Sequence, residues 1–316
     1  MEFKNYLVGF MIALGMCLVA YPLFIPFLHK LKYGQTVSEY MPSQAKKTGT
    51  PTMGGVIFII VPLLVSLVFF NHIWADPKVM LVGLAFIGYG IIGFIDDYII
   101  VVTKNNDGLS PRSKLLMQII LSVVFYLIYQ SNVSTEISIF NFSIDLGIFY
   151  VLLVVLLFAS SSNAVNLTDG MDGLAGGTVF ISYIPFVLFA LEQGEYNVAL
   201  LVVIIMGAIL GYLFFNRHPA KIFMGDAGSL ALGGVLAALG LVLKKELLVI
   251  VIGMVFVIET ASVVLQIASV KLRGKRIFKC SPIHYHFEQS GMKEEHVVLM
   301  EYIFGAICAL IGYLIG

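Results

Sequence analysis

The chain has 316 residues, of which 59% are hydrophobic and only 12% are charged. Soluble domains carry about 25% charged residues, so this composition excludes an ordinary soluble protein and predicts a polytopic membrane protein. The formal net charge is zero, so no basic excess points to nucleic acid. The three cysteines, Cys17, Cys280 and Cys308, are far apart and match neither a metal spacing nor a disulfide framework.

The first apolar run is too long for a cleaved signal peptide. It extends from about Tyr6 to Leu28, whereas the apolar region of a signal peptide has about 7–15 residues. A helix of this length crosses a hydrocarbon core of about 30 Å. Lys30 and Lys32 follow the run, against a lone Lys4 before it, which predicts an N-terminus outside the cell.

The apolar runs predict ten membrane-spanning helices, and the even number puts both termini outside. The spans are residues 4–29, 53–71, 78–96, 113–130, 147–165, 174–192, 197–215, 227–243, 247–270 and 296–315. On this topology all of the 19 lysines and arginines are cytoplasmic except Lys4, Lys78, Lys244 and Lys245. That bias is what the positive-inside rule demands. We therefore expect an all-α polytopic fold in which residues 1–316 form one integral membrane domain.

Aspartates gather on the same predicted face. The cytoplasmic ones are Asp96, Asp97, Asp107, Asp169, Asp172 and Asp226, whereas only Asp76 and Asp145 lie outside. Acids contribute little to topology, so the topology does not account for this distribution. We interpret it as a site on the cytoplasmic face that requires carboxylates.

The polar segment before the second span, residues 46–55, has two interpretations. Its two lysines, three threonines and three glycines could hold phosphate through ammonium groups and backbone donors. Alternatively, it is a positively charged flank in which Thr52 caps a helix. The residue order is not that of a P-loop.

Asp96 and Asp97 end the predicted third span. Adjacent residues on a helix point about 100° apart, so the two carboxylates are expected to act differently, one towards a metal and the other towards a proton or a lysine. The alternative is a pair of solvated acids at the headgroup level. Ser110 and Pro111 predict a helix start, which puts Lys114 in the first turn of the fourth span, near the level of Asp96.

Residues 166–177 place two carboxylates, a carboxamide and four glycines between apolar runs. Asn166, Asp169 and Asp172 are three apart, which predicts that they share one helical face. Oxygen ligands beside bare backbone suit a hard cation that carries phosphates. The alternative is a polar loop that caps two membrane helices.

The loop between the seventh and eighth spans carries Asn216, Phe223, Asp226 and Ser229. Asp226 stands between glycines at a predicted helix N-terminus, where the dipole attracts phosphate and a carboxylate can hold the accompanying cation. Phe223 either stacks on a base or anchors the chain at the membrane interface.

Three further features lie near the C-terminus. Glu259 is the one acid deep in a span, and it is either functional or paired with another helix. A basic run after the ninth span favours contact with anionic lipid headgroups. His284 and His286 are two apart, so no helical face holds both; contact with phosphate or sugar is preferred over zinc, because no other nitrogen or sulfur ligands accompany them.

Five motifs occur in order along the chain, at residues 50–55, 96–97, 166–173, 223–226 and 282–287. Together they resemble the phospho-N-acetylmuramoyl-pentapeptide transferase family of the polyprenyl-phosphate N-acetylhexosamine-1-phosphate transferase superfamily, over nearly the whole chain. The Pro-Ile-His segment favours this family over the sibling N-acetylglucosamine-1-phosphate transferases. One departure is that the family has three consecutive histidines, whereas the middle position here is Tyr285.

The resemblance implies a multi-pass homodimer in the bacterial cell membrane, with a cytoplasmic cleft that needs Mg²⁺. The implied reaction of peptidoglycan synthesis joins UDP-N-acetylmuramoyl-pentapeptide to undecaprenyl phosphate, giving lipid I and UMP. Asp226 would ligate Mg²⁺, with Asn166 as a further oxygen donor. The catalytic group would be Asp96, Asp97, Lys114, Asp226, His284 and His286. The nucleotide pocket would be formed by Lys47, Thr52, Asn166, Asp169, Asp172, Asn216, Phe223 and Ser229.

The residue chemistry agrees with this expectation. Phosphoryl transfer depends mostly on positioning and charge neutralisation, which a metal and a lysine can supply. The second pKa of a lipid phosphate is about 6, so it is largely ionised, which favours direct attack over an aspartyl-phosphate intermediate. A secondary transporter would instead place ionisable groups near the midplane, and it would release no UMP.

Overall fold

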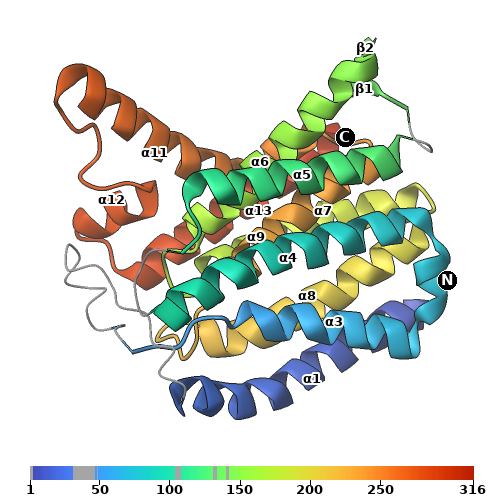
Figure 1. Ribbon diagram of the computed structural model, residues 1–316, viewed down its shortest axis with the longest axis horizontal. Helices are drawn as coiled ribbons and strands as arrows, with labels where there is room; N and C mark the ends of the chain where they lie inside the picture. Colours follow the sequence, from blue (N-terminus) through green and yellow to red (C-terminus); the bar gives the residue numbers. More distant parts are fainter. Residues whose placement is uncertain (1–2, 31–46, 48, 104–107, 131–133, 140–141) are drawn as a thin grey trace.

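The computed structural model describes residues 3–30, 47, 49–103, 108–130, 134–139 and 142–316 (Figure 1). Lys46 and Asp107, which the sequence suggested as part of the site, lie outside the described residues. The long helices are α1 (Phe3–Lys30), α3 (Gly55–Phe69), α4 (Pro77–Thr103), α5 (Pro111–Tyr129), α6 (Tyr150–Thr168), α7 (Leu174–Glu192), α8 (Tyr196–Asn216), α9 (Gly225–Val242), α11 (Met254–Arg273) and α13 (Glu294–Ile315). The shorter elements are η1 (Asn71–Ala75), β1 (Glu136–Ile139), β2 (Phe142–Asp145), η2 (Gly147–Phe149), α10 (Leu248–Ile252) and α12 (Ile283–Gln289).

The expected all-α polytopic fold is confirmed. Among the described residues, nine helices are long and apolar enough to cross a membrane, and α3 is a shorter apolar helix of 15 residues. The count of ten spans and their orientation stay predictions. Two small strands, β1 and β2, pair in antiparallel register with Glu136 opposite Asp145, and the sequence analysis did not predict them.

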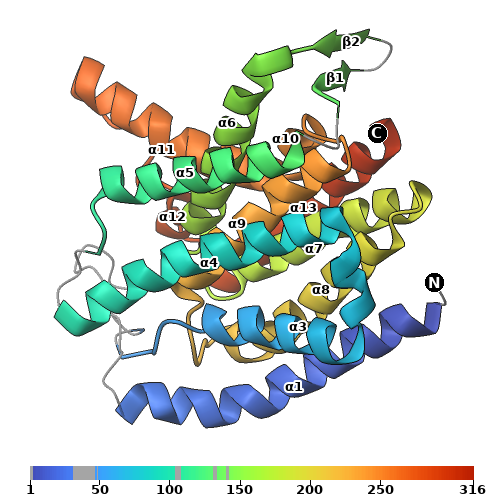
Figure 2. The same ribbon diagram turned by 45° about the vertical axis from the view of Figure 1, so that its right-hand side comes forward.

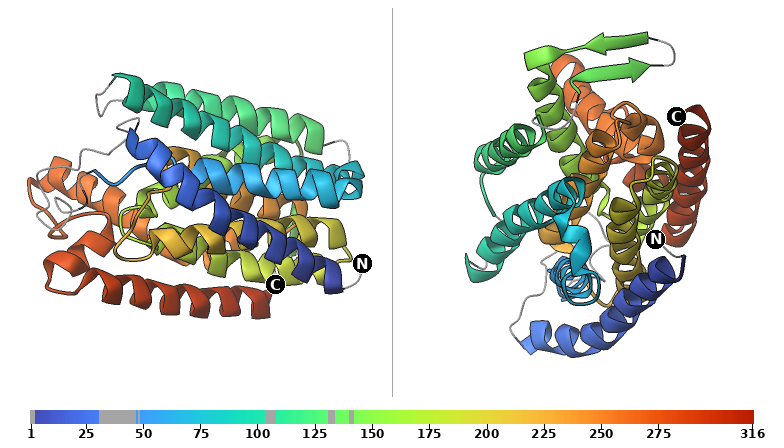
Figure 3. Two further views of the ribbon diagram at one scale, coloured as in Figure 1. Left: turned by 90° about the horizontal axis from the view of Figure 1, so that it is seen from below. Right: turned by 90° about the vertical axis from the view of Figure 1, so that its right-hand side faces the viewer.

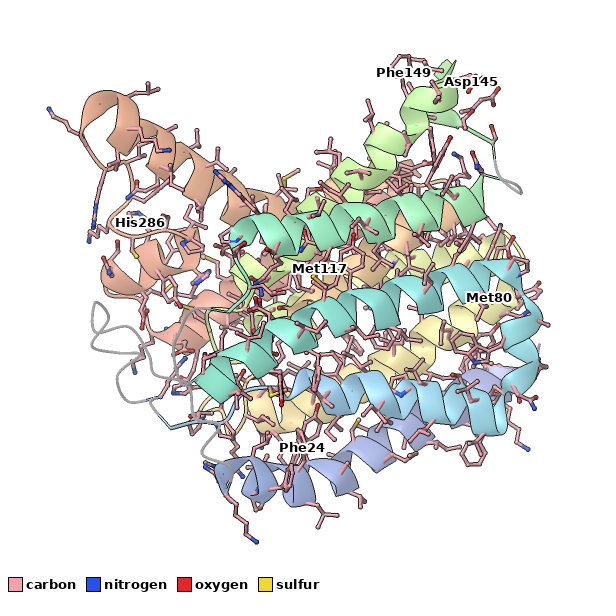
Figure 4. All side chains as sticks on the ribbon, in the orientation of Figure 1. Phe24, Met80, Met117, Asp145, Phe149 and His286 are labelled. Carbon is pink, nitrogen blue, oxygen red and sulfur yellow. The ribbon has the colours of Figure 1, made fainter. Side chains whose placement is uncertain are left out.

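The helices run lengthwise and give the bundle two distinct ends. The left view of Figure 3 shows α13 along one edge and α4 with α5 along the opposite edge. Asp145, at the end of the hairpin, and His286, on α12, lie at opposite ends (Figure 4). In Figures 1 and 2, α11 projects away from the other helices on the α12 side. The end that carries α12 is also where α4, α6 and α8 finish and α5, α7, α9 and α13 begin, as contacts between residues at these helix ends show.

Helix α9 forms the centre of the bundle, because every residue from Ala227 to Val242 is buried. Its small side chains allow close approach: a Cβ on Gly55 of α3 would lie only 2.3 Å from the Cα of Gly228. Small residues at such crossings let membrane helices pack backbone against backbone. The functional end of α9 is therefore held firmly by its neighbours.

Two predicted spans need correction. Residues 247–270 were expected to form one helix, but the backbone breaks at Gly253 into α10 and α11. The third span was expected to end at Asp96, but α4 continues to Thr103, so Asp96 and Asp97 lie within the helix. Both Asp96 and Asp97 are buried there, which excludes the interpretation of solvated headgroup-level acids.

Candidate active site

The segment before α3 is paired with the segment before α9. Phe223 donates its N–H to Pro51 O at 2.8 Å, and Gly54 donates to Phe223 O at 2.8 Å. The helix α3 is preceded by Gly54, without a side-chain cap, so the alternative in which Thr52 caps a helix is wrong. Thr52 is instead buried in this paired segment. Two motifs that are distant in the sequence are thus one structural unit.

Four helices bring polar side chains together at the start of α9. Lys114 Nζ lies 2.5 Å from Asp226 Oδ2 and 3.1 Å from Asp96 Oδ1. Asn166 Nδ2 donates to Asp226 Oδ1 at 2.7 Å, and Asp96 Oδ1 also accepts the N–H of Leu109 at 2.8 Å. Ser110 Oγ accepts from Ser113 N and caps α5, which confirms the predicted helix start. We call Asp96, Asp97, Lys114, Asn166 and Asp226 the acidic cluster.

Asp97 has a different set of partners from Asp96, as expected for adjacent helical positions. Its Oδ1 accepts the N–H of Asp226 and its Oδ2 accepts the N–H of Ala227, both at 3.0 Å. These are free amides in the first turn of α9, so the Asp97 carboxylate caps that helix across the bundle. The cap fixes Asp226 relative to α4.

Asn166, Asp169 and Asp172 do not share one helical face, so that prediction is wrong. Helix α6 ends at Thr168, and Asp169 has non-helical dihedrals of φ −77° and ψ 53°. Asn166 points to Asp226 and also donates to Ser229 Oγ at 2.8 Å. Asp172 lies in the turn after α6 and takes part in a second group of charges.

That second group consists of Lys47, Asp172, His218 and Glu294, which we call the Lys47 cluster. Lys47 Nζ lies 2.7 Å from Asp172 Oδ1 and 2.6 Å from Glu294 Oε1. His218 Nδ1 lies 3.0 Å from Asp172 Oδ2 and 3.8 Å from Glu294 Oε2. Ligand atoms of Asp172, His218 and Glu294 fall within 4.8 Å of one another, as a metal site would require. The Lys47 ammonium already supplies a positive charge to both carboxylates there.

Asp169 is electrostatically linked to both clusters. Its burial raises its pKa to about 7, and the charges of Asp226 and Asp172 act in the same direction, whereas Lys47 opposes them. A carboxyl group with such a pKa changes its charge near neutral pH, unlike an ordinary aspartate at about 3.9. The residues 166–173 therefore join the acidic cluster to the Lys47 cluster.

Asn216 orders the backbone beside the Lys47 cluster. Its Oδ1 accepts the N–H of Gly173 at 2.9 Å and its Nδ2 donates to Ile222 O at 2.8 Å. Asn216 is only 2% exposed, and its amide group holds the loop that contains Gly173 next to the loop that contains Ile222. The Phe223 side chain is partly exposed, in the same loop between α8 and α9.

The two histidines of α12 lie in different surroundings. His284 is fully buried, with its Nδ1 3.0 Å from Glu259 Oε2, so Glu259 is paired with another helix. A Cβ on Gly170 would lie 2.3 Å from His284 Nε2, which shows how closely the ring contacts residues 166–173. His286 Nδ1 accepts the N–H of Lys279 at 3.2 Å and orders the preceding loop. A catalytic role for either histidine stays a prediction.

The comparisons with known proteins decide the family. A family model described as "Glycosyl transferase family 4" matches residues 79–244, and one described as "Phospho-N-acetylmuramoyl-pentapeptide-transferase signature 1" matches residues 47–59. A phospho-N-acetylmuramoyl-pentapeptide-transferase of Bacillus subtilis (strain 168) is 47% identical over 97% of this chain and 95% of its own length. A protein of the same name from Geobacillus sp. (strain WCH70) is 48% identical over 92% of this chain and 91% of its own length. Another, from Shouchella clausii (strain KSM-K16), is 45% identical over 100% of this chain and 99% of its own length.

The chain belongs to the phospho-N-acetylmuramoyl-pentapeptide-transferase family. It is therefore a transferase, as predicted from the ordered motifs. The matched signature covers the segment that includes Lys47 and Thr52 and pairs with Phe223. The position where the family resemblance leads us to expect the middle histidine is occupied by Tyr285, whose hydroxyl donates to Gly170 O at 2.9 Å.

The acidic cluster suits a divalent metal in its charge and ligand type. It holds three carboxylates and one ammonium group, an excess of two negative charges when all are ionised. Carboxylate oxygens are the ligands that Mg²⁺ prefers, and the Asp226 side chain is 23% exposed. The residues present thus fit the metal that the family resemblance implied.

Two residues of the Lys47 cluster, His218 and Glu294, were not predicted from the sequence. Neither was Tyr302, whose hydroxyl donates to Gly173 O at 2.6 Å. Glu294 and Glu295 begin α13, where acids are usual because they stabilise the helix dipole. Nothing in the local sequence separates one from the other, so only the tertiary structure identifies Glu294.

Proposed function

We propose that this protein transfers phospho-N-acetylmuramoyl-pentapeptide from UDP-N-acetylmuramoyl-pentapeptide to undecaprenyl phosphate, forming lipid I and releasing UMP. The observation that carries the proposal is the acidic cluster, in which Asp96, Lys114 and Asp226 meet at the start of α9 in a chain of this family. The name of the relatives specifies the group that they transfer.

The proposal includes the location of the chemistry. We infer a multi-pass protein of the bacterial plasma membrane, one domain over residues 1–316, with both termini outside and the acidic cluster on the cytoplasmic face. The positive-inside bias supports this orientation. Asp145, expected outside, and His286, expected on the cytoplasmic side, lie at opposite ends of the bundle, which agrees with it (Figure 4). A homodimer is part of the proposal on the family resemblance.

Charge neutralisation is the main task of the acidic cluster. A Mg²⁺ ion held by Asp226, with Asn166 beside it, would neutralise the diphosphate of the donor. Lys114 forms ion pairs with both Asp96 and Asp226, so its ammonium group is held in one position at the site. A fixed positive charge of this kind stabilises developing negative charge without reorganisation.

The partners of the two adjacent aspartates support direct attack by the lipid phosphate. Both oxygens of Asp97 accept backbone N–H groups of α9, and Asp96 is 3% exposed and bound to Lys114. A carboxylate engaged in this way is a poor nucleophile, because attack would require loss of its hydrogen bonds. The lipid phosphate is already ionised and needs little activation. We infer that Asp96 orients Lys114 and that Asp97 orients Asp226.

A transfer assay with two donors tests this function. The purified protein, undecaprenyl phosphate and Mg²⁺ should release UMP with UDP-N-acetylmuramoyl-pentapeptide and not with UDP-N-acetylglucosamine. Activity with only the second donor would assign the chain to the sibling transferases. No UMP with either donor would contradict the enzyme and favour a transporter.

A further inference from the structure

The N-terminus of α13 reaches Lys47 and Asp172, two of the residues that the family resemblance implies for the nucleotide pocket. Glu294 Oε1 accepts from Lys47 Nζ at 2.6 Å and from the backbone N–H of Asp172 at 2.7 Å. Its other oxygen lies 3.8 Å from His218 Nδ1. One carboxylate from the last helix thus contacts three segments that are distant in the sequence, at Lys47, Asp172 and His218.

The contacts of Glu294 are largely shielded from solvent. The side chains of Lys47 and Glu294 are 11% and 10% exposed, and that of Asp172 is 2% exposed. Ion pairs on an open surface contribute little, whereas removing one partner of a shielded pair is costly, because the other charge is left without compensation. Lys47 is therefore held in one place by two carboxylates.

The rest of α13 is also seated against residues 166–173. Val297 and Val298 form a buried apolar cluster with Met171 and Leu174. Tyr302, two turns along α13, donates to Gly173 O. This packing fixes the helix, so that the position of the Glu294 carboxylate is set by the fold and not by Lys47.

The helix dipole does not account for Glu294. Acids are favourable in the first turn of any helix, and Glu295 occupies that turn as well. Glu295 is exposed, whereas Glu294 is turned towards Lys47 and Asp172. The two neighbouring glutamates therefore offer a matched comparison between a dipole role and a site role.

We propose that Glu294 is a positioning residue of the nucleotide pocket, which fixes the Lys47 ammonium group and the Asp172 backbone for the uridine nucleotide of the donor. The proposal rests on the proposed function, since it assigns Glu294 to the donor pocket of that reaction. A glutamine at position 294 keeps an oxygen that can accept the Asp172 N–H, so loss of the charge acts through Lys47. The proposal gives Glu294 no contact with the lipid acceptor. Loss of the Glu294 charge should therefore weaken nucleotide binding and leave use of the lipid unchanged.

Glu294→Gln tests the proposal with Glu295→Gln as the matched control. A charge-assisted hydrogen bond is lost, so KM for the nucleotide sugar and Kd for UMP should rise about tenfold or more. The value of kcat should change less than about threefold, and KM for undecaprenyl phosphate should not change. Glu295→Gln should match the wild type in all of these. Equal results for the two variants, or a loss confined to kcat, would overturn the proposal.

A double-mutant cycle with Lys47→Met separates positioning from direct contact. If Glu294 acts through Lys47, adding Glu294→Gln to Lys47→Met should change the Kd for UMP less than about threefold. A full tenfold effect in both backgrounds would show that Glu294 acts independently. A fall of more than about 10 °C in the melting temperature of Glu294→Gln would make it a residue of the fold and also overturn the proposal.

The UMP measurement keeps this proposal distinct from the proposed function. Equilibrium binding of UMP requires no turnover, so it tests Glu294 even in the absence of transfer. If the wild type released no UMP from the donor, the proposed function would be contradicted. If the wild type were active and Glu294→Gln bound UMP normally, only the positioning role would be contradicted.

Discussion

Tyr285→Phe removes one hydrogen bond between α12 and the segment that carries Asp169 and Asp172. The Tyr285 hydroxyl donates to Gly170 O at 2.9 Å, and its ring packs against the apolar cluster that contains Met171 and Leu174. A phenylalanine ring keeps that packing, so only the hydrogen bond is lost. A neutral hydrogen bond contributes about 0.5–1.5 kcal/mol net, which corresponds to a change of about two- to tenfold.

We therefore expect kcat/KM for the nucleotide sugar to fall about two- to tenfold in Tyr285→Phe, measured by UMP release with saturating lipid. Tyr302→Phe is the matched control, because its hydroxyl donates to Gly173 O in the same segment, and it should have a similar effect. Tyr285→His, which restores the family pattern, should change the rate less than tenfold. A loss of more than about a hundredfold in Tyr285→Phe exceeds one neutral hydrogen bond and would place the phenol against the substrate.

Three further predictions concern Asp226, Phe223 and Asp169. Asp226→Asn should abolish turnover at every Mg²⁺ concentration while the melting temperature stays near that of the wild type; near-normal rates would refute its role. Phe223→Ala should raise KM for the nucleotide sugar about ten- to a hundredfold more than KM for the lipid, since base stacking contributes about 1–3 kcal/mol, and an unchanged constant would favour an interfacial anchor. Asp169 holds its proton more tightly when folded, with a pKa of about 7 against about 3.9 unfolded, so the free energy of unfolding should fall as pH rises from about 4 to 7. Asp169→Asn should remove that fall and melt higher than the wild type at pH 8 without added nucleotide, whereas parallel melting curves would contradict the raised pKa.

The apolar pattern predicted most helices but not their interruptions. Residues 174–192 were predicted as a span, and α7 is Leu174–Glu192, because an apolar run starts directly after a glycine-rich turn. The part of the predicted span 247–270 around Gly253, residues 247–258, is apolar on both sides of the glycine, so the break gives no signal in hydropathy. Both strands of the hairpin alternate polar and apolar residues, but over only four positions each, the shortest alternation that indicates a strand, and this signal was not used.

The acidic cluster could be predicted because a membrane topology restricts where charges can meet. Asp96, Lys114 and Asp226 were expected at one interface, and the structure joins them by direct ion pairs. The capping of α9 by Asp97 could not be predicted, because it depends on how α4 crosses α9. Burial of His284 against Glu259 is likewise a consequence of how α12 packs against α11.

The Lys47 cluster could not be predicted from the sequence, for a different reason. Lys47 and Glu294 are 247 positions apart, and each has an ordinary local explanation, a positively charged flank for the lysine and a helix N-terminus for the glutamate. An ion pair between such positions leaves no trace in spacing or periodicity. Asp172 was predicted to lie on one helical face with Asn166, but α6 ends at Thr168, so Asp172 lies in the turn that follows.

The most direct test of direct transfer at the acidic cluster is a single-turnover measurement with stoichiometric protein, Mg²⁺ and labelled UDP-N-acetylmuramoyl-pentapeptide, with and without undecaprenyl phosphate. We predict no UMP and no labelled protein in the absence of lipid, followed by stoichiometric formation of UMP and labelled lipid when undecaprenyl phosphate is added. Stoichiometric release of UMP without lipid, with the label retained on the protein, would contradict direct attack and assign a covalent intermediate to one of the aspartates.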